Sequence, residues 1–355
     1  MKNNLHIFSD TLLKRQQNTL YFQTIINDEE DEDKQLYKEE FFNCKNSLIP
    51  TGDRKYIPVE SVDSIFAVGN INFNSRFLYF LSQNRIPLHS FSLKGNYAGS
   101  FIPADRQVSG DILLKQTEYF KNYTQRMYIA REIITASANN MLANIKYYQS
   151  RGRYLSDHIE QIEELLFNID DSETINEIMG FEGQIRRTYY NSWQQIFTYP
   201  IDFYRRVKNP PDNMINALIS YGNMIVYGTV INEIYKTRIY PEIGFVHEPG
   251  DSKLPLVYDI ADIFKPLITD RTIFKLINKN IISSKQFFTK NGFCRINKKA
   301  KQIFAREIED KLYTKISIDS SSKRLSYKSI IREEFYKLIK HFNNEMEYKA
   351  FRTKW

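Results

Sequence analysis

The first part of the chain alternates between apolar and polar positions over short distances. Several of its segments share this pattern and are separated by turn residues: HIFSD, TLLKRQQNTLYFQTII, KYIPVESVDSIFAV and IPLHSFS. Such alternation is typical of strands that bury one face. The segment NFNSRFLYFLSQN has helical spacing instead, and Asn74 stands where it can cap that helix. Residues 1–95 are therefore expected to form a small β-rich domain.

A second pattern begins after residue 95. The stretch KGNYAGSFIPADRQVSGD contains glycine, proline and small polar residues, as domain linkers do, and it predicts a linker over residues 96–110. Beyond it, apolar residues recur with the 3.6-residue period of helices. The expected helices cover residues 110–150, 154–168, 171–198, 211–235, 253–280, 296–314 and 326–343. These elements predict an α+β fold in which a larger all-α C-terminal domain, residues 111–355, follows the β-rich one.

Composition fits such a two-domain protein. The 355 residues are 42% hydrophobic, which is enough for sizeable cores. No apolar run approaches the roughly 18–20 residues that cross a bilayer, and the N-terminus has no signal-peptide pattern. Cys44 and Cys294 are far apart and form no metal-binding spacing. These features predict a cytoplasmic protein with two reduced thiols and no membrane partner.

Charge is distributed unevenly along the chain. The net charge is +7, but residues 265–355 hold 22 Lys and Arg against 9 Asp and Glu, a balance of +13, so the other 264 residues sum to −6. A basic C-terminal quarter suggests a polyanionic partner, although solvated helices with lysines on their exposed faces would give the same count. The acidic run DEEDEDK at residues 28–34 is interpreted as a solvated hairpin tip.

One predicted helix has a carboxylate on its apolar face. Glu182 falls on a stripe whose other members are apolar or aromatic, namely Ile175, Ile178, Ile185 and Tyr189. A lone carboxylate there would be desolvated. Gly180 and Gly183 flank it, and glycines in such a place often let another backbone or a ligand come close. Arg186, one turn later, could instead form an ordinary helix ion pair with Glu182.

Two further carboxylates occur in the stretch GFVHEPGDSKLPLVYDIADIFKP, residues 244–266. Asp259 and Asp262 lie side by side at the flank of an apolar helix face, within reach of one common ion. Either one could be structural, because an Asp can cap a neighbouring helix and Lys265 can pair with the other. Pro266 cannot donate a hydrogen bond to the carbonyl of residue 262, so the backbone is loosened there.

His247 lies in a loop, 12 residues before Asp259 and 15 before Asp262. One loop and one helical turn can therefore bring the three residues together. Glu, His and Asp side chains make a mixed nitrogen and oxygen donor set that suits Mn²⁺, and Mg²⁺ less readily. A cation would offset the charge of the buried carboxylates, which predicts a divalent-metal site. The plainer interpretation is that His247 is only polar loop surface.

At these residues the chain resembles the CRISPR-associated integrase–endonuclease family, the catalytic subunit of the spacer-acquisition machinery. The resemblance runs nearly end to end, and its segments follow in the family's order: FSDTLLKRQQNTLYF, YIPVESVDSIFAVGNINFNSRFLYFLSQNRIPLHSFS, GSFIPADRQVSGDILLKQ, MGFEGQIRRTYY, PPDNMINALISYGNMIVYG and HEPGDSKLPLVYDIADIFKPLITDR. It implies the metal ligands Glu182, His247 and Asp262, with Asp259 supporting them. The N-terminal pattern is most similar to the branch that accompanies type I systems.

The resemblance also implies a reaction and partners. With Mg²⁺ or Mn²⁺, the free 3′-OH of a short DNA fragment attacks a phosphodiester of a CRISPR repeat array, and the same site can hydrolyse branched DNA. The implied partners are double-stranded and branched DNA, a second copy that binds through the N-terminal domain, and a small second acquisition protein. The acidic run at residues 28–34 has no counterpart in the family pattern.

The residues alone indicate a DNA surface only coarsely. Arg126 and Arg131 stand near tyrosines in the predicted helix 110–150, where cations can hold phosphates and aromatic rings can stack on bases. A tyrosine stripe at helical spacing is more often core. Lys265 and Arg186 are the cations nearest the predicted site. Two other functions stay open: a nucleic-acid-binding structural protein without chemistry, and a stand-alone nuclease of branched repair intermediates.

Overall fold

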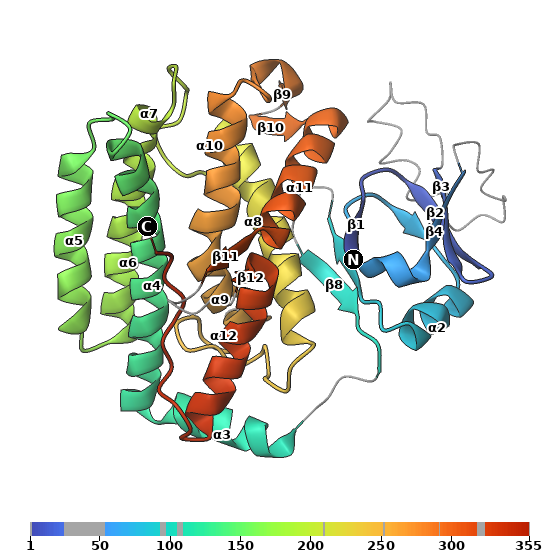
Figure 1. The fold of residues 1–355 in the computed structure, drawn as a ribbon, viewed down its shortest axis with the longest axis horizontal. Coiled ribbons are helices and arrows are strands. Elements are labelled where there is room, and N and C mark those ends of the chain that lie inside the picture. The colour runs from blue at the N-terminus through green and yellow to red at the C-terminus, as the bar shows by residue number, and fades with distance from the viewer. Residues whose placement is uncertain are drawn as a thin grey trace. The chain divides into compact units, whose positions relative to one another are not determined.

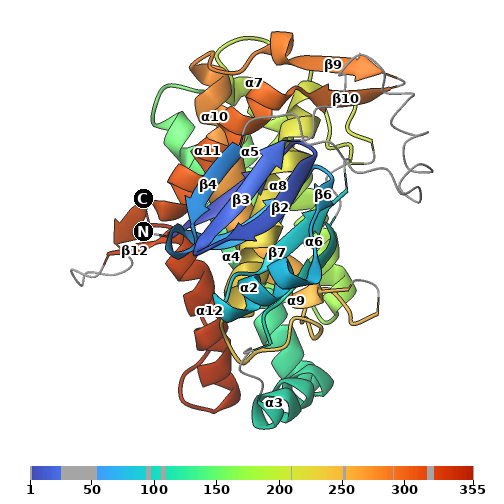
Figure 2. The same cartoon turned by 90° about the vertical axis from the view of Figure 1, so that its right-hand side faces the viewer.

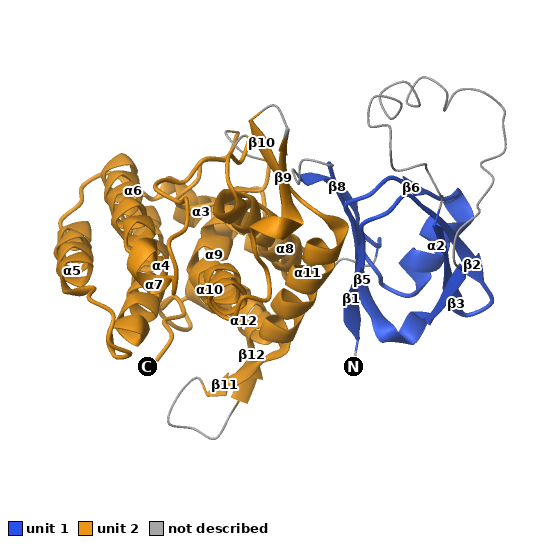
Figure 3. Cartoon of the chain, turned by 90° about the horizontal axis from the view of Figure 1, so that it is seen from above, with its two compact units in different colours: residues 1–105 blue, residues 106–355 orange. Residues whose placement is uncertain are grey.

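The computed structural model describes residues 2–24, 54–92, 97–104, 109–208, 210–250, 253–290, 292–317 and 324–354. The chain forms two compact units, residues 1–105 and 106–355 (Figure 3). The first unit is rich in strands and the second in helices, which confirms the α+β fold class predicted from the sequence. The acidic run at residues 28–34 lies outside the described residues, so its interpretation as a hairpin tip stays a prediction.

The N-terminal unit contains two four-stranded sheets (Figures 1 and 2). In the first sheet the strand order is β1 (Asn3–Ile7), β5 (Val62–Ala67), β7 (Leu88–Phe91) and β8 (Tyr97–Phe101). In the second sheet the order is β4 (Arg54–Pro58), β3 (Thr19–Thr24), β2 (Thr11–Gln16) and β6 (Ile71–Asn72). Strands β1, β5 and β7 are parallel, whereas β8 pairs antiparallel to β7 and β3 pairs antiparallel to both of its neighbours.

One apolar core joins the two sheets to the helix α2 (Ser75–Gln83), which follows the short turn η1 (Val59–Ser61) and strands β5 and β6 in the chain. The helix contributes Phe77 and Phe80 to this core. As predicted, Asn74 caps the helix, because its side chain accepts a hydrogen bond from the Phe77 N–H at 3.1 Å. Strand β8, however, lies inside the predicted linker. That part of the linker prediction is wrong, because ladder hydrogen bonds to β7 order the glycine-containing segment.

The C-terminal unit is mainly helical (Figure 1). Its helices are α3 (Gly110–Lys121), α4 (Tyr123–Gln149), α5 (Ser156–Asp170), α6 (Ile175–Asn191), α7 (Trp193–Ile196), α8 (Met214–Ile234), α9 (Pro255–Lys265), α10 (Arg271–Asn278), α11 (Lys298–Tyr313) and α12 (Tyr327–Phe342). A π-helical turn, η2 (Pro266–Asp270), joins α9 to α10. Helix α4 packs against α5, α6 and α9, and α8 packs against α9, α11 and α12.

The predicted helices are present, but three of them are interrupted. The predicted helix 110–150 breaks at Asn122, whose side chain caps α4, and the predicted helix 171–198 is divided at Ser192 into α6 and α7. The predicted helix 253–280 changes to π geometry at Pro266. Two short antiparallel hairpins also occur where an all-α domain was expected. They are β9 (Phe287–Lys290) with β10 (Phe293–Ile296), preceded by the turn η3 (Ser284–Gln286), and β11 (Lys315–Ser317) with β12 (Arg324–Ser326).

Helix α8 is apolar almost all round. It has the length and composition of a membrane span. An 18-residue stretch of it has a mean hydropathy of 1.3, but 78% of that stretch is buried inside the protein. Between Ile215 and Ile234 its half-buried residues are only Ser220, Asn223 and Tyr227. A helix that is hydrophobic on every side is typical of the core of a large unit.

Candidate metal and nucleic-acid site

A row of polar side chains on α4 supports the end of α9. Pro266 has no N–H, and the π-helical turn that follows changes the hydrogen-bond pattern, so carbonyls near this point need other donors. Ser137 donates to the Asp262 carbonyl at 2.8 Å, and Asn140 donates to the Ile263 carbonyl at 2.9 Å. Farther along, Asn144 donates to the Pro266 carbonyl at 2.8 Å. These contacts fix the backbone that carries Asp262.

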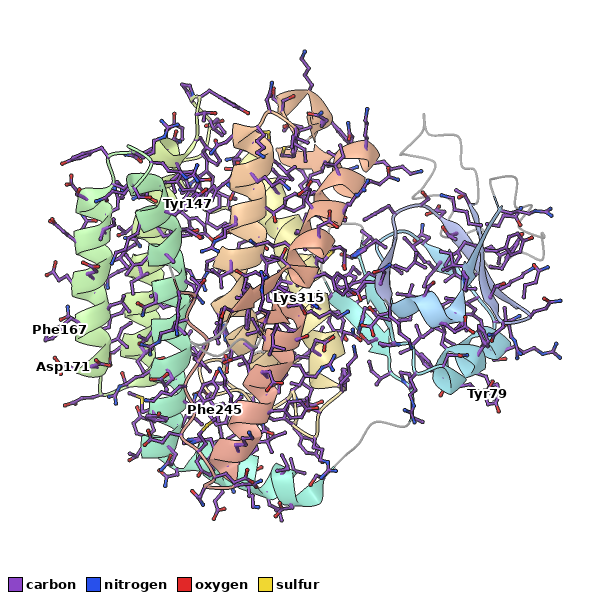
Figure 4. The ribbon with its side chains drawn as sticks, in the orientation of Figure 1. Tyr79, Tyr147, Phe167, Asp171, Phe245 and Lys315 are labelled. Atoms are coloured by element: carbon purple, nitrogen blue, oxygen red, sulfur yellow. The ribbon has the colours of Figure 1, made fainter. Side chains whose placement is uncertain are left out.

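The loop that carries His247 is built around the carboxylate of Asp259, which is fully buried. The Oδ2 atom of Asp259 accepts hydrogen bonds from the backbone N–H groups of Phe245 and Val246, at 2.6 and 3.1 Å. Its Oδ1 atom accepts both the backbone N–H of His247, at 3.0 Å, and the ring Nδ1 of His247, at 2.7 Å. Figure 4 shows the neighbouring Phe245 beside α12, where its ring lies against Phe342. Asp259 therefore orients both the loop and the imidazole.

Gly244 is required at the start of this loop. A Cβ atom there would lie 2.9 Å from the Asp259 carboxylate and 2.8 Å from the His247 carbonyl, closer than such atoms approach. By contrast, a Cβ at Gly180 or Gly183 would meet nothing within 4 Å. Among the residues that the structure describes, no other backbone packs closely against those two glycines.

Glu182 and Asp262 face one common positive charge. The guanidinium of Arg186 forms an ion pair with Glu182 through Nε, and its Nη2 lies 3.2 Å from the Oδ1 of Asp262. Lys265 pairs with the same Oδ1 atom, and its Nζ lies 4.4 Å from the centre of the Tyr227 ring. Both ion pairs that the sequence left as alternatives are thus formed, and α6 and α9 are brought together through Arg186.

The charges in this group shift each other's pKa. Burial alone would raise the pKa of Asp262, but Lys265 and Arg186 outweigh it and lower the pKa to about 2. Burial would lower the pKa of His247, but its hydrogen bond to Asp259 and the charges of Asp259 and Asp262 outweigh burial, so the net pKa is raised. Glu182 and Asp262 are connected through Arg186, and the charges of Asp262 and His247 act on each other.

Among the described residues, no three His, Cys, Asp or Glu side chains are close enough to hold a metal ion as they stand. The physical reason is that these groups are already paired. Arg186 forms ion pairs with both carboxylates, and Asp259 holds the imidazole through Nδ1. The donor types nevertheless fit a hard divalent cation. Because Asp259 holds His247 through Nδ1, Nε2 is the ring nitrogen left for a cation.

Two of the predicted DNA contacts have other roles. Arg126 is buried, and its guanidinium donates to the Phe245 carbonyl at 3.0 Å and pairs with Glu248 at 3.0 Å. Arg131 donates to the Ser172 carbonyl in the turn between α5 and α6. Each arginine therefore uses at least one donor inside the fold, and the prediction that the two residues hold phosphates stays a prediction. Arg126 braces the His247 loop instead.

The tyrosines of α3 and α4 also serve the fold. The hydroxyl of Tyr119 donates to the His341 carbonyl, that of Tyr123 to the Glu173 carbonyl, and that of Tyr128 to the Tyr348 carbonyl. The rings of Tyr119 and Tyr128 lie against His341, whereas Tyr123 is about half exposed. Lys265 and Arg186, in contrast, lie at the candidate site as predicted.

Fold and site together define a class of protein: a two-unit α+β protein whose helical unit gathers carboxylates, a histidine and several cations in one place. A family model for the CRISPR associated protein Cas1 matches residues 5–310. The chain is also 38% identical to the CRISPR-associated endonuclease Cas1 of Fusobacterium nucleatum, an alignment that covers 100% of this chain and 98% of the relative. The chain belongs to the Cas1 family, and the resemblance found in the sequence is confirmed.

Solved structures share this fold. A Cas1 protein from Thermotoga maritima is 34% identical, with a TM-score of 0.76, over 99% of this chain and 100% of that one. A casposase bound to integration product has a TM-score of 0.80 over 98% of this chain and 92% of that one. At 18% identity the casposase supports the fold alone.

The α4 row generates a first prediction. Asn140 donates to the Ile263 and Phe351 carbonyls and accepts the Thr353 N–H at 2.8 Å. Asn140→Leu leaves these buried groups without partners, and each such group costs about 1–3 kcal/mol. We expect the free energy of unfolding in urea to fall by at least about 2 kcal/mol. Asn139→Leu is the matched control, because within the described part of the chain Asn139 bonds only the Thr135 carbonyl of its own helix. Equal losses in the two variants would contradict the role of Asn140.

A second prediction concerns Asp270, which is buried at the end of η2 and accepts the Tyr189 hydroxyl at 3.1 Å. Burial raises its pKa to about 7. Between about pH 4 and pH 7 the unfolded chain loses this proton while the folded protein keeps it, so Asp270 lowers stability as pH rises. Asp270→Asn removes this effect. We expect the stability advantage of Asp270→Asn over wild type to grow across that pH range, by at most about 1.4 kcal/mol per pH unit. A constant difference would contradict the raised pKa.

Proposed function

We propose that this protein is a divalent-metal-dependent DNA endonuclease and integrase that inserts short foreign DNA fragments into a CRISPR repeat array. The observation that carries the proposal is the shared cation of Glu182 and Asp262, beside a histidine whose orientation is fixed by a buried carboxylate. Membership of a family whose relatives are named endonucleases supports the nuclease chemistry. The fold shared with a casposase bound to integration product is in keeping with strand transfer.

The proposed metal ligands are Glu182, His247 and Asp262, with Mg²⁺ or Mn²⁺ as the ion. To bind it, the two carboxylates would exchange Arg186 for the divalent cation, and His247 would contribute Nε2. When bound, the cation would polarise the scissile phosphate and offset the charge that develops on it. The rest of the site holds these donors in place: Asp259 fixes the imidazole, and Lys265 supplies a permanent positive charge beside Asp262.

In the proposed reaction the oxygen of a fragment's 3′-OH forms a bond to phosphorus in the repeat while the existing phosphorus–oxygen bond of that strand breaks. One phosphodiester is made for each one lost, so no nucleotide cofactor is needed. The attacking hydroxyl gives its proton to solvent, and the leaving oxygen takes up a proton to become a free hydroxyl. With water in place of the 3′-OH, the same site would cleave branched DNA. Arg186, once released from Glu182, is free to pair with the phosphate.

The proposed partners are inferred from the family and the fold. A solved complex that contains Cas1 and Cas2 has a chain with this fold, which supports a small second acquisition protein as a partner. We further propose a homodimer through the N-terminal unit, double-stranded and branched DNA as substrates, and a cytoplasmic location. Light scattering on the purified protein would give the oligomeric state directly.

The decisive test uses a branched DNA that mimics a half-integrated fragment, with Mn²⁺, Mg²⁺ or EDTA. We expect strand transfer or cleavage that needs metal, and a loss of more than about 100-fold in His247→Ala, because even residues that only orient a ligand are worth 10–100-fold. Removing the imidazole leaves Asp259 with its three backbone donors, so the loop should persist. His158→Ala, on α5, is the matched control and should keep full activity.

A different outcome would favour a second function. The ion pairs of Arg186 with Glu182 and of Lys265 with Asp262 satisfy both carboxylates without any metal, as in a structural nucleic-acid-binding protein. Tight DNA binding with no chemistry in any metal, and no change in His247→Ala, would replace the enzyme by that structural role.

The place of Arg186 between the two carboxylates generates a further prediction. Its charge competes with a divalent cation for the same oxygens, so Arg186→Gln should bind Mn²⁺ about tenfold more tightly than wild type in the absence of DNA. Titration calorimetry measures this directly. Arg187→Gln is the matched control, because Arg187 is the exposed neighbour on the same helix. Equal Mn²⁺ affinity in Arg186→Gln and wild type would show that the arginine does not occupy the metal position.

A further inference from the structure

The last described residues of the chain, 346–354, form neither helix nor strand. After α12 they run back along α4, and we call them the C-terminal strap (Figure 1). Glu334, which is buried on α12, accepts the Tyr348 hydroxyl at 2.8 Å and the Phe351 N–H at 3.3 Å. Tyr348 and Phe351 are themselves buried. The strap is therefore packed into the helical unit, although it lies outside residues 5–310, which the family model matches.

The C-terminal strap is also tied to α4. Glu132 accepts the Ala350 N–H at 3.2 Å, and Asn140 accepts the Thr353 N–H at 2.8 Å. Two exposed cations of the strap pair with the same Glu132 carboxylate. Backbone N–H groups that donate to such side chains fix the course of a segment that has no regular secondary structure. The strap thus joins α12 to α4 and holds one position against both.

The same strap packs against the helix that carries the candidate ligand Asp262. The ring of Phe351 is stacked on that of Phe264 of α9, with the ring centres 5.8 Å apart and the planes 5° apart. Beside this stack, Asn140 donates to both the Phe351 carbonyl and the Ile263 carbonyl, at 3.1 and 2.9 Å. Phe264 follows Asp262 by two positions, which is about 200° around a helix of 3.6 residues per turn. The strap therefore supports α9 from the side opposite to Asp262.

On the side of α9 toward the site, the contacts depend on distance. Asp262 lies 3.2 Å from the Arg186 guanidinium, and Asp259 accepts three backbone N–H groups of residues 245–247 at 2.6, 3.1 and 3.0 Å. Hydrogen bonds of this kind occur only over a narrow range of distances. Protein interiors are close-packed and transmit strain, so a change of volume behind α9 affects the contacts in front of it.

We propose that Phe351 is a positioning residue for the candidate site. Through Phe264, the C-terminal strap holds α9 at the distance from α6 and from the loop of residues 245–247 at which both carboxylates of α9 make their contacts. A smaller side chain at position 351 leaves space behind α9, and the helix then shifts away from the site. The inference about the position of α9 needs no metal. Its consequence for the affinity of a divalent cation rests on the proposed function.

Hydrogen exchange without metal tests the position of α9. In EDTA, we expect the amides of residues 245–247 to exchange about fivefold faster in Phe351→Leu than in wild type, because a stacked aromatic pair behind their acceptor is lost. Phe264→Leu removes the same pair from the other side and should give the same increase. The double variant should exchange no faster than either single one, because the two side chains act as one unit. Mass spectrometry of peptides that cover residues 244–248 measures these rates.

Phe197→Leu is the matched control. Phe197 is a buried phenylalanine of the same unit whose ring lies against Trp193 and Phe274 rather than against α9. The substitution is the same, so it reports what a general loss of packing does to the loop, and exchange at residues 245–247 should keep the wild-type rate. With Mn²⁺ in titration calorimetry, Phe351→Leu should bind about tenfold more weakly than wild type, as when an outer support of a ligand is lost, and Phe197→Leu should bind equally well.

The two measurements separate this inference from the proposed function. Faster exchange in Phe351→Leu, together with a wild-type protein that binds no Mn²⁺, would keep the positioning role and reject the metal site. Mn²⁺ binding by wild type, with wild-type exchange and affinity in Phe351→Leu, would reject the positioning role alone. Equal acceleration in Phe197→Leu would also overturn it, since the effect would then come from stability. Additive effects in the double variant would show that Phe351 does not act through Phe264.

Discussion

A helix that ends at a proline leaves carbonyl groups without helical hydrogen-bond donors. Another part of the protein must donate to these carbonyls, and the donors that do so position the candidate site. Pro266 and the π-helical turn that it begins disturb the backbone hydrogen bonds at the end of α9, one turn after Asp262. The donors come from Ser137, Asn140 and Asn144, three buried polar side chains along α4. A buried polar group without a partner is costly, so these contacts specify one position of α9 against α4. That position decides where Asp262 and Lys265 meet Arg186 of α6.

The second constraint is the burial of Asp259. A carboxylate inside a protein needs hydrogen-bond donors, and three backbone N–H groups of the loop and one ring nitrogen of His247 surround this one. These contacts fix the backbone of residues 245–247. Gly244 is part of the same arrangement, since any side chain there would collide with that carboxylate. Because the Asp259 carboxylate needs several donors at once, it holds His247 beside it although the two residues are 12 positions apart in the sequence.

Much of this could be predicted from the sequence where the signal is local. Helical period, the cap at Asn74 and the placing of Glu182 on an apolar stripe depend only on neighbours in the chain. What the sequence did not show depends on partners far away along the chain. The contacts by which Arg126 braces Phe245 and Glu248 are tertiary, so no local pattern could indicate them. Strand β8 was hidden because pairing with β7, rather than its own composition, orders it. Gly244 and the polar row on α4 were missed for the same reason.

The charges at the site connect the binding of its two proposed ligands, the divalent cation and a DNA phosphate. With Arg186 and Lys265 in place, the carboxylates of Glu182 and Asp262 are already neutralised. A divalent cation entering alone would have to displace Arg186 from both carboxylates and leave its guanidinium without a partner there. A DNA phosphate entering beside it would give the displaced guanidinium a partner and lower that cost. By linkage, the same phosphate would then bind more tightly once the metal is present. The arrangement of charges therefore favours metal and DNA binding together over either one alone.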